Sequence, residues 1–451
     1  MKKINALIMT LLIISNAYLL YSNYSLKKDV LQEQTTSTPK KKNFMSMMIE
    51  TEAGSGKYQV SSSNTWSTEG YVFNSELSKC ENKSKLSWDD TNKKVVMEGN
   101  VSDKCYVYFD VYVAPAYHEV CNDNTLACHT AKLYTGTQGE NNIYYHDASL
   151  TNGAGDNSYR YAGASDAVNN YVCFGSKVTP CPTDNLYRII GVFGDKVKLI
   201  KSDYATSTLL GKDGDYRQPY DYNGFGNAGG YKGNYYGGIA GCYWNYKNNT
   251  TINSGKGSNT WSTSLLNKTN LNTNFITNIG ADWAAKISET TWKVGGNTDK
   301  NIRDVIPSVA YQNEIVGPVT TNTSDNATEY SAKIGLMYAS DYGFAAAPSA
   351  WTANLKTYNA EAIKNVNWMY MGLIEWTISR TADTLYGAFC LNPGDVSSTT
   401  VGINSPAVRP VFYLSSSIKF TSGEGTAVNP IRLNWLTDSF NRPLIKPRKK
   451  R

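Results

Sequence analysis

The stretch Trp376-Thr377-Ile378-Ser379-Arg380 opens a C-terminal region that ends in Val408-Arg409-Pro410-Val411-Phe412-Tyr413-Leu414. Between the two lie Gly387-Ala388-Phe389-Cys390 and the turn-forming Asn392-Pro393-Gly394-Asp395. Segments this rich in aromatic and β-branched residues, separated by Gly, Pro, Asn and Ser, are typical of short strands. Short strands need partners to be stable. We therefore expect the preceding part of the chain to supply them.

The clearest partner is a predicted β-hairpin. Leu186-Tyr187-Arg188-Ile189-Ile190-Gly191-Val192-Phe193 and Lys196-Val197-Lys198-Leu199-Ile200 flank the turn Gly194-Asp195. Residues 213–249 follow, and their many glycines and aromatics hold neither a strand nor a helix period, which indicates a long loop. Residues 261–279 return to helical spacing, and residues 291–294 and 333–338 are predicted strands.

The composition favours a secreted, β-rich protein of several units. A chain of 451 residues predicts about three units. Hydrophobic residues at 41% suffice for packed cores, whereas charged residues at 18% fall below the usual quarter. Tyr, Asn, Ser, Thr and Gly make up the difference, a profile common among secreted binding proteins.

The positive charge is concentrated in a C-terminal tail, residues 434–451. The six basic residues beyond Asp438 equal the net charge of +6, so the chain up to Asp438 sums to zero. A nucleic-acid-binding domain would carry basic patches on its fold, so we expect no nucleic-acid partner. The tail itself is predicted to be disordered and attracted to an anionic wall polymer.

The N-terminus is typical of an export signal. Lys2 and Lys3 precede an apolar run over residues 4–21, which is at the short limit for a membrane-spanning helix. We expect residues 1–24 to remain as an anchor helix with the membrane as its partner and the rest of the chain extracellular. The alternative is secretion after signal cleavage. Residues 25–47 are predicted to form a flexible linker.

Two further segments precede the hairpin. Residues 48–113 contain strand-length segments and a predicted turn at Asp89-Asp90-Thr91-Asn92, which together indicate a small β module. Residues 114–185 are interpreted as a connector. All three histidines of the chain lie in the connector, but their spacing matches no metal-binding pattern. They are His118, His129 and His146.

The eight cysteines favour disulfides over metal ligation, because their number is even and several lie close together in an apparently exported chain. Sequence alone does not fix the connectivity. Pairing neighbours first gives Cys80–Cys105, Cys121–Cys128 and Cys173–Cys181, and leaves Cys242 to pair with Cys390.

Several of these segments resemble a known group of proteins. The motifs are Asp184-Asn185-Leu186-Tyr187-Arg188-Ile189-Ile190, residues 333–342, Trp376-Thr377-Ile378-Ser379-Arg380 and Val408-Arg409-Pro410-Val411-Phe412-Tyr413-Leu414. They resemble an uncharacterised family of exported Firmicutes domains. The layout of a hairpin, two short helices, long loops and closing strands is similar to the C-type-lectin-like superfamily. The resemblance implies an α+β, C-type-lectin-like domain over residues 186–433 whose long loops bind a ligand, preceded by the all-β module and the anchor.

The chain departs from the characterised members of that superfamily. It lacks the Glu-Pro-Asn, Gln-Pro-Asp and Trp-Asn-Asp motifs of calcium-dependent lectins, so we expect no metal and no other cofactor. The related formylglycine-generating enzymes use a reactive cysteine pair. Cys242 and Cys390 are the only distant pair here, and a structural disulfide is the simpler interpretation.

The resulting hypothesis is a non-enzymatic binding or adhesion protein of the cell surface that recognises a glycan or a host or bacterial surface protein. The predicted ligand face consists of aromatics of the glycine-rich loop: Tyr235, Tyr236, Tyr243 and Trp244. The alternative for these aromatics is packing against the domain. Alternative functions are a structural surface-layer protein or an enzyme like the formylglycine-generating group. Trp376 and Arg409 are interpreted as structural.

Overall fold

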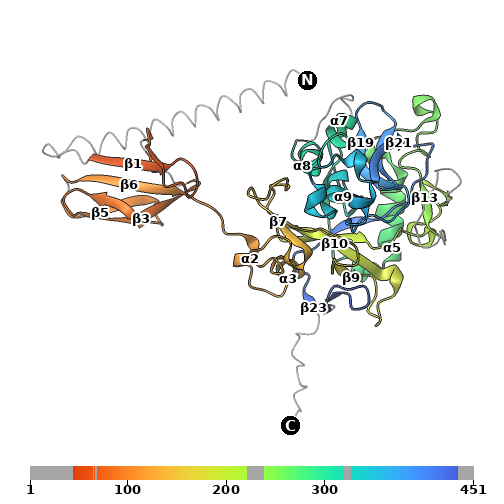
Figure 1. The fold of residues 1–451 in the computed structure, drawn as a ribbon, viewed down its shortest axis with the longest axis horizontal. Coiled ribbons are helices and arrows are strands. Elements are labelled where there is room, and N and C mark those ends of the chain that lie inside the picture. The colour runs from red at the N-terminus through yellow and green to blue at the C-terminus, as the bar shows by residue number, and fades with distance from the viewer. Residues whose placement is uncertain are drawn as a thin grey trace, which may run out of the picture. The chain divides into compact units, whose positions relative to one another are not determined.

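The structure is a computed structural model that describes residues 44–63, 65–66, 69–100, 102–220, 238–317 and 327–434. Its contacts divide the chain into two compact units, Met1–Pro115 and Ala116–Arg451. Figure 1 labels strands β1, β3, β5 and β6 in the first unit, and elements from α2 onward in the second.

The first unit is a small β module, as its sequence predicts. Its sheet has the order β2-β1-β6-β3, with β1 parallel to β6 and the other pairs antiparallel. A separate hairpin joins β4 to β5. The core is formed by Met47, Val107 and Phe109, and the ring of Trp88 packs edge-on against Phe109 at 5.6 Å. The bounds are β1 Phe44–Glu50, β2 Tyr58–Val60, β3 Tyr71–Cys80, β4 Lys85–Asp89, β5 Lys94–Glu98 and β6 Lys104–Val111.

The second unit is built around an eight-stranded sheet. Its main path runs β14-β22-β11-β10-β8-β7, while β18 pairs with β22 and β9 with β10. The predicted hairpin is confirmed, because β10 and β11 pair across Gly194-Asp195. The strands are β7 Ile143–His146, β8 Ser158–Tyr161, β9 Tyr171–Cys173, β10 Leu186–Phe193, β11 Lys196–Lys201, β14 Ile287–Ser288, β18 Ile334–Gly335 and β22 Val411–Leu414. Three of these strands come from residues 114–185, so that segment is part of the fold rather than a connector.

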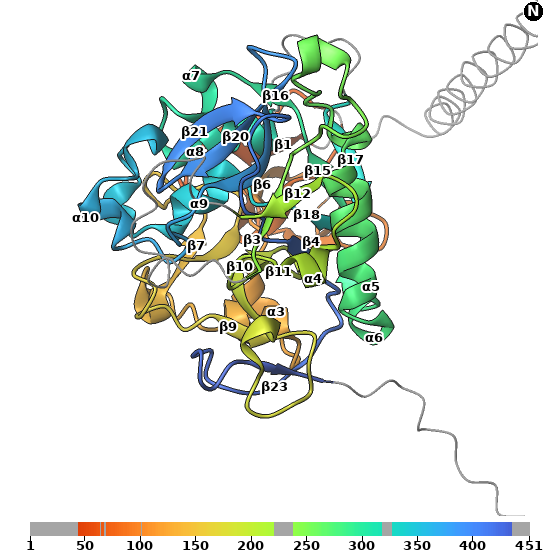
Figure 2. The ribbon, with the colours of Figure 1, turned by 90° about the vertical axis from the view of Figure 1, so that its right-hand side faces the viewer.

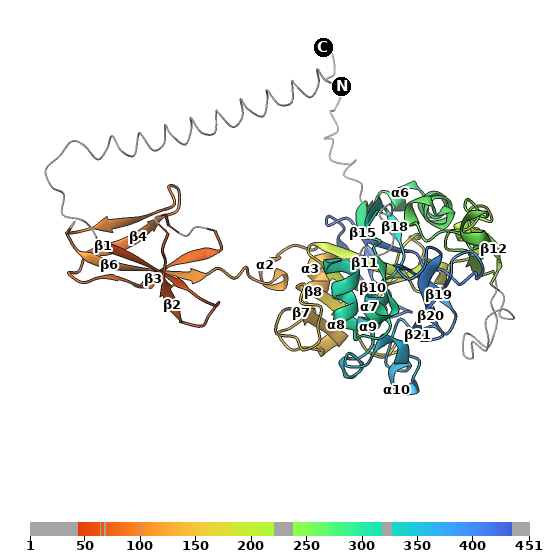
Figure 3. The same cartoon turned by 90° about the horizontal axis from the view of Figure 1, so that it is seen from above.

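A second sheet carries most of the C-terminal stretch. It has the order β16-β19-β20-β21, with β16 Gly296–Asn297, β19 Glu375–Thr381, β20 Gly387–Asn392 and β21 Asp395–Thr400. Figure 3 shows β19, β20 and β21 side by side. The closing strands are therefore shared between two sheets, because Val411–Leu414 joins β11 in the first sheet instead.

Short elements fill the remainder of the second unit. The two-stranded pairs are β12 Tyr216–Pro219 with β13 Ala240–Cys242, β15 Thr290–Lys293 with β17 Glu329–Ala332, and β23 Phe420–Ser422 with β24 Arg432–Leu433. The α-helices are α2 Tyr117–Val120, α3 Leu126–Ala131, α4 Ser207–Leu210, α5 Ile276–Asn278, α6 Ala281–Ala284, α7 Asp299–Ile302, α8 Pro307–Tyr311, α9 Ala339–Ala345 and α10 Glu361–Lys364.

Other helical turns accompany them. The 3-10 turns are η1 Glu140–Asn142, η2 Thr183–Asn185, η5 Ile252–Gly255, η6 Trp261–Thr263, η9 Pro348–Ala350 and η10 Leu355–Thr357, and the π-helical turns are η7 Leu266–Phe275 and η8 Gln312–Val316. The predicted helical spacing of residues 261–279 is confirmed by η6, η7 and α5, whose apolar side chains Leu266, Leu271 and Phe275 are buried. Figure 2 shows α5 and α6 along one side of the second unit.

The predicted fold class, an α+β C-type-lectin-like domain, is wrong. The structure is mostly β, with 33% strand and 21% helix distributed among many small sheets. Much of the packing comes from hydrogen bonds between short elements that are distant in sequence, which local periodicity does not specify. In η7, Asn270 and Asn274 both donate to the carbonyl of Leu210.

The predicted membrane anchorage also needs correction. Within the described ranges, no helix has both the length and the apolar character needed to cross a membrane. The anchor predicted at residues 1–24 lies outside those ranges, as does most of the linker predicted after it. The structure gives the membrane-anchored localisation no support, and we do not retain it.

Three of the four predicted disulfide bridges are present. The bridges Cys80–Cys105, Cys121–Cys128 and Cys173–Cys181 are confirmed. The predicted Cys242–Cys390 bridge is wrong, because both cysteines are buried free thiols, on β13 and β20 respectively. Burial raises the pKa of both thiols, that of Cys390 to about 12. Pairing by elimination fails here because a bridge also requires suitable geometry between the two Cα atoms.

Candidate functional site

Buried ionic groups of the second unit serve its packing. Lys198 donates to Asp341 at 2.5 Å, and Arg160 approaches the same carboxylate at 3.7 Å. Arg409 donates to Glu375 at 2.7 Å, and burial raises the pKa of Glu375. All five side chains are almost completely enclosed. A surface ligand therefore has no access to them, and Arg409 is structural, as expected.

Several depressions lie on the described surface. In the first unit, Tyr71, Phe73 and Trp88 line one of about 200 Å³. In the second unit, Asp184, Lys201 and their neighbours line one of about 340 Å³. A third, of about 250 Å³, lies at the end of the β19–β20–β21 sheet and differs from the others in its chemistry.

We call this third depression the hydroxyl groove. Every residue that lines it except Gly387 carries a side-chain oxygen, and most of these are hydroxyls. The lining consists of Asp299, Thr381, Asp383, Thr384, Tyr386, Gly387, Ser398, Thr399 and Thr400. Such a surface both donates and accepts hydrogen bonds at closely spaced points.

The groove is held by the turn that joins β19 to β20. The side-chain amide of the buried Asn259 donates to the carbonyls of Thr381 and Thr384 at 2.8 Å and of Gly387 at 3.0 Å. The Thr381 hydroxyl donates to the Gly387 carbonyl at 3.1 Å. A Cβ atom at Gly387 would lie 2.5 Å from that hydroxyl oxygen, so this position requires glycine.

The far wall comes from β21, the edge strand of the sheet. Its last residues pair with the start of β20, with Thr400 opposite Gly387. This register places the hydroxyls at the end of β21 beside the turn. On the remaining side, Arg303 holds the Asp299 carboxylate at 2.8 Å.

Some of the groove's polar groups are available to a ligand. The exposed carboxylate of Asp383 and the hydroxyls of Ser398 and Thr400 have no side-chain partner among the described residues. The hydroxyl of Thr399, by contrast, accepts from Asn404. The ring of Tyr386 lies 4.5 Å from the Lys256 ammonium. The groove thus offers an anionic acceptor, hydroxyls and an aromatic ring within one small surface.

The lining does not resemble the common catalytic centres. It contains neither histidine nor cysteine, and one of its two carboxylates, Asp299, is already paired with Arg303. Acid–base catalysis needs a group positioned to give up or take a proton at the reacting atom. The arrangement is suited to accepting hydrogen bonds from a ligand.

The predicted ligand face is not assembled as expected. Trp244 is fully buried, and its indole donates to the Thr377 carbonyl at 3.0 Å, so it cannot contact a surface ligand. Tyr243 is half-buried, with its ring 4.7 Å from Tyr246 and 5.5 Å from the Arg217 guanidinium, and it does not line the groove. Tyr235 and Tyr236 lie outside the described residues.

Sequence reasoning missed the groove itself. Its residues come from three separated segments, and only the run Ser397-Ser398-Thr399-Thr400 stands out in the sequence. Only Val396 separates that run from the Asn392-Pro393-Gly394-Asp395 turn, so the available signal was a strand after a turn that carries several hydroxyls.

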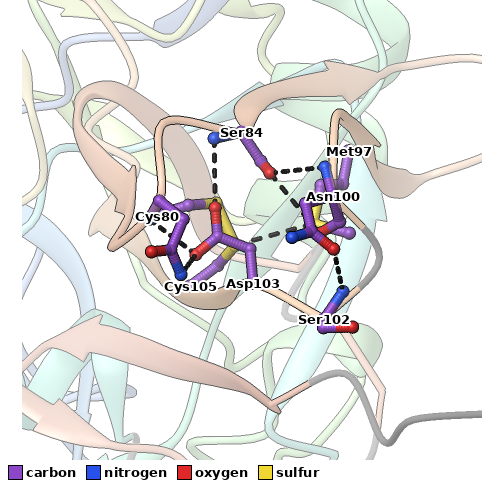
Figure 4. The surroundings of a disulfide bond; sticks show 8 residues. Cys80, Ser84, Met97, Asn100, Ser102, Asp103 and Cys105 are labelled. Atoms are coloured by element: carbon purple, nitrogen blue, oxygen red, sulfur yellow. Dashed lines mark hydrogen bonds between the residues drawn. A yellow bond between two sulfur atoms is a disulfide. The ribbon is translucent and has the colours of Figure 1, made fainter.

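A metal centre has little support in the described part of the chain. The one group of metal-ligating side chains there is Cys80, Asp103 and Cys105. Figure 4 shows the two sulfurs joined in a disulfide, so neither is a thiolate ligand. Asp103 accepts instead from the backbone N–H groups of Asn82 and Ser84. Burial opposes ionisation of Asp103, but these hydrogen bonds outweigh it and lower the pKa to about 2.

Comparison with known proteins adds no further assignment: the chain matches no family model, no curated protein and no solved structure.

Proposed function

We propose that this chain is a non-enzymatic binding protein that recognises a glycan in the hydroxyl groove. A sugar presents closely spaced hydroxyls, each of which donates and accepts, and the groove presents the same kind of groups in return. The observation that carries the proposal is that side-chain oxygens line the groove almost continuously. Among them, the oxygens of Asp383, Ser398 and Thr400 have no side-chain partner among the described residues and can bond to a ligand.

Two further observations support the proposal. The three disulfides are typical of proteins that fold in an oxidising compartment, where polysaccharides are common partners. The groove is also held in shape without a ligand, through the contacts of Asn259 and Gly387. Pre-organisation lowers the entropic cost of binding.

The chain has further proposed partners besides a glycan. A surface protein as the ligand and an anionic wall polymer at the basic tail stay predictions, and residues 435–451 of the tail lie outside the described residues. The resemblance to an exported Firmicutes family is likewise a proposal, resting on the quoted motifs alone.

The test is a screen of the full chain on an array of bacterial and host glycans, followed by calorimetric titration of the best binder. Asp383→Asn should weaken the complex about 10-fold or more, because hydrogen bonds to a charged acceptor contribute about 1.5–3 kcal/mol. Ser398→Ala should weaken it less. Both variants should melt at the temperature of the parent, since these side chains lack internal side-chain partners.

The matched control is Asp166→Asn, which removes an exposed carboxylate that lines none of the three depressions. It should leave affinity unchanged. A glycan that binds Asp383→Asn as tightly as the parent would move the site elsewhere. Absence of any glycan binding would contradict the proposal, and release of sugar fragments would reveal an enzyme.

A further inference from the structure

Arg380, at the end of the Trp376–Arg380 motif, is a buried cation without a counter-ion among the described residues. It is 2% exposed, and its Nε donates to the Val294 carbonyl at 3.0 Å. Its Nη2 has no hydrogen-bond partner in the described ranges. Burial lowers the pKa of Arg380, and no carboxylate offsets this. The other buried arginines are better satisfied: Arg160 and Arg409 each pair with carboxylates, and Arg188 bonds to several oxygens.

The absence of a side chain at Gly296 leaves space for the Arg380 guanidinium. A Cβ atom at Gly296 would lie 2.8 Å from Nη1 of Arg380. Gly296 and Arg380 are paired across β16 and β19, so the glycine stands directly beside the arginine.

Trp261 is a second buried donor without a partner. It is 1% exposed, and its indole Nε1 has no hydrogen-bond acceptor in the described part of the chain. Five other buried tryptophans each donate to a backbone carbonyl: Trp244, Trp292, Trp351, Trp368 and Trp376. Buried polar groups in proteins are normally satisfied, so the exception requires a reason.

Both residues line the same small cavity, of about 10 Å³. A cavity of this size holds about one water-sized particle. Phosphate, sulfate and organic acids are too large for it. We call it the Arg380 cavity.

The charges around the Arg380 cavity favour an anion over water. A water molecule could accept from both donors, but it would leave the buried charge of Arg380 uncompensated. Glu329 also lines the cavity, yet its carboxylate is bound by Lys293 and its side chain is 49% exposed. It does not pair with Arg380.

We propose that the Arg380 cavity binds a single halide ion, chloride under ordinary conditions, held by Arg380 Nη2 and Trp261 Nε1. The ion neutralises the buried guanidinium and stabilises β19 where it leads into the hydroxyl groove. The site is independent of the glycan proposal, since it requires no second ligand.

The test is thermal unfolding of the full chain, dialysed into sodium gluconate and then compared at equal ionic strength in sodium chloride and sodium bromide. Gluconate is too large for the cavity. A ligand that binds only the folded state raises Tm, so chloride and bromide should each raise it by about 2 °C. Crystals grown in bromide should show anomalous scattering at the cavity.

Matched variants separate this site from general salt effects. Trp261→Phe keeps the ring and removes the N–H, and it should abolish most of the halide-dependent rise. Trp292→Phe removes a satisfied indole N–H elsewhere; it should lower Tm and leave the halide-dependent rise intact. Glu329→Gln removes a like charge from the lining and should strengthen halide binding at low salt.

Three results would overturn the proposal. Equal Tm in chloride and gluconate, with no bromide peak, means that the cavity holds water. A rise in Tm that is the same in Trp261→Phe and the parent places the halide elsewhere. A Tm of Glu329→Gln in gluconate that lies below that of Lys293→Gln, without stronger halide binding, would identify Glu329 as the counter-ion of Arg380.

Discussion

At the scale of single residues, buried tryptophans join segments that are distant in sequence. The indole of Trp244 donates to Thr377 on β19, while the indole of Trp376 donates back to the Cys242 carbonyl on β13 at 2.8 Å. The ring of Trp244 also lies 4.7 Å from Trp261. These contacts attach the glycine-rich segment to the closing strands without the disulfide that the sequence suggested.

Trp244→Ala should therefore destabilise the second unit by about 3–5 kcal/mol, because truncation leaves a cavity and removes the hydrogen bond to Thr377. Urea unfolding monitored by circular dichroism measures the change. The half-buried neighbour provides the control, and Tyr243→Ala should cost clearly less. A Trp244→Ala protein with the stability of the parent would contradict the packing role.

At the scale of elements, a hairpin of contiguous residues can be predicted from the sequence, whereas the pairing of strands from distant segments cannot. The β10–β11 hairpin is predictable because its turn, Gly194-Asp195, and both apolar runs are contiguous. The pairing of β22 with β14, β18 and β11 joins strands from widely separated segments, and no local pattern specifies it. The hydroxyl groove is likewise assembled from distant segments, because Asp299 lies on α7 and Asp383 lies in the turn between β19 and β20.

The side chain of Asn259 is expected to hold the β19–β20 turn as one unit. Asn259→Ala leaves the carbonyls of Thr381, Thr384 and Gly387 without their donor, at a cost of about 2–3 kcal/mol. Hydrogen–deuterium exchange over residues 381–387 should become faster, and glycan binding should be lost.

The control for this element is Asn278→Ala. Asn278 also donates to two carbonyls, those of Thr208 and Leu209, but in an exposed setting where water can replace it. The Asn278→Ala substitution should change hydrogen–deuterium exchange only around α4. Unchanged exchange over residues 381–387 in Asn259→Ala would mean that the turn holds its shape without the asparagine.

At the scale of the whole molecule, the two compact units have different sources of stability. The second unit has an extensive core with many fully buried aromatics, whereas the core of the first unit is small. Small cores commonly depend on a covalent link. In the first unit that link is Cys80–Cys105, which joins the paired ends of β3 and β6.

Replacing both cysteines of that bridge with serine should destabilise the first unit alone. The bridge closes a loop with a sequence separation of 25 residues. In the loop-entropy model, a loop of that length contributes about 3–4 kcal/mol, which is a large share of the stability of so small a unit. Differential scanning calorimetry of the full chain should show one transition moving to lower temperature while the other stays in place. A double serine variant that keeps both transitions, or that shifts them together, would show that the first unit does not depend on the bridge for a stability of its own.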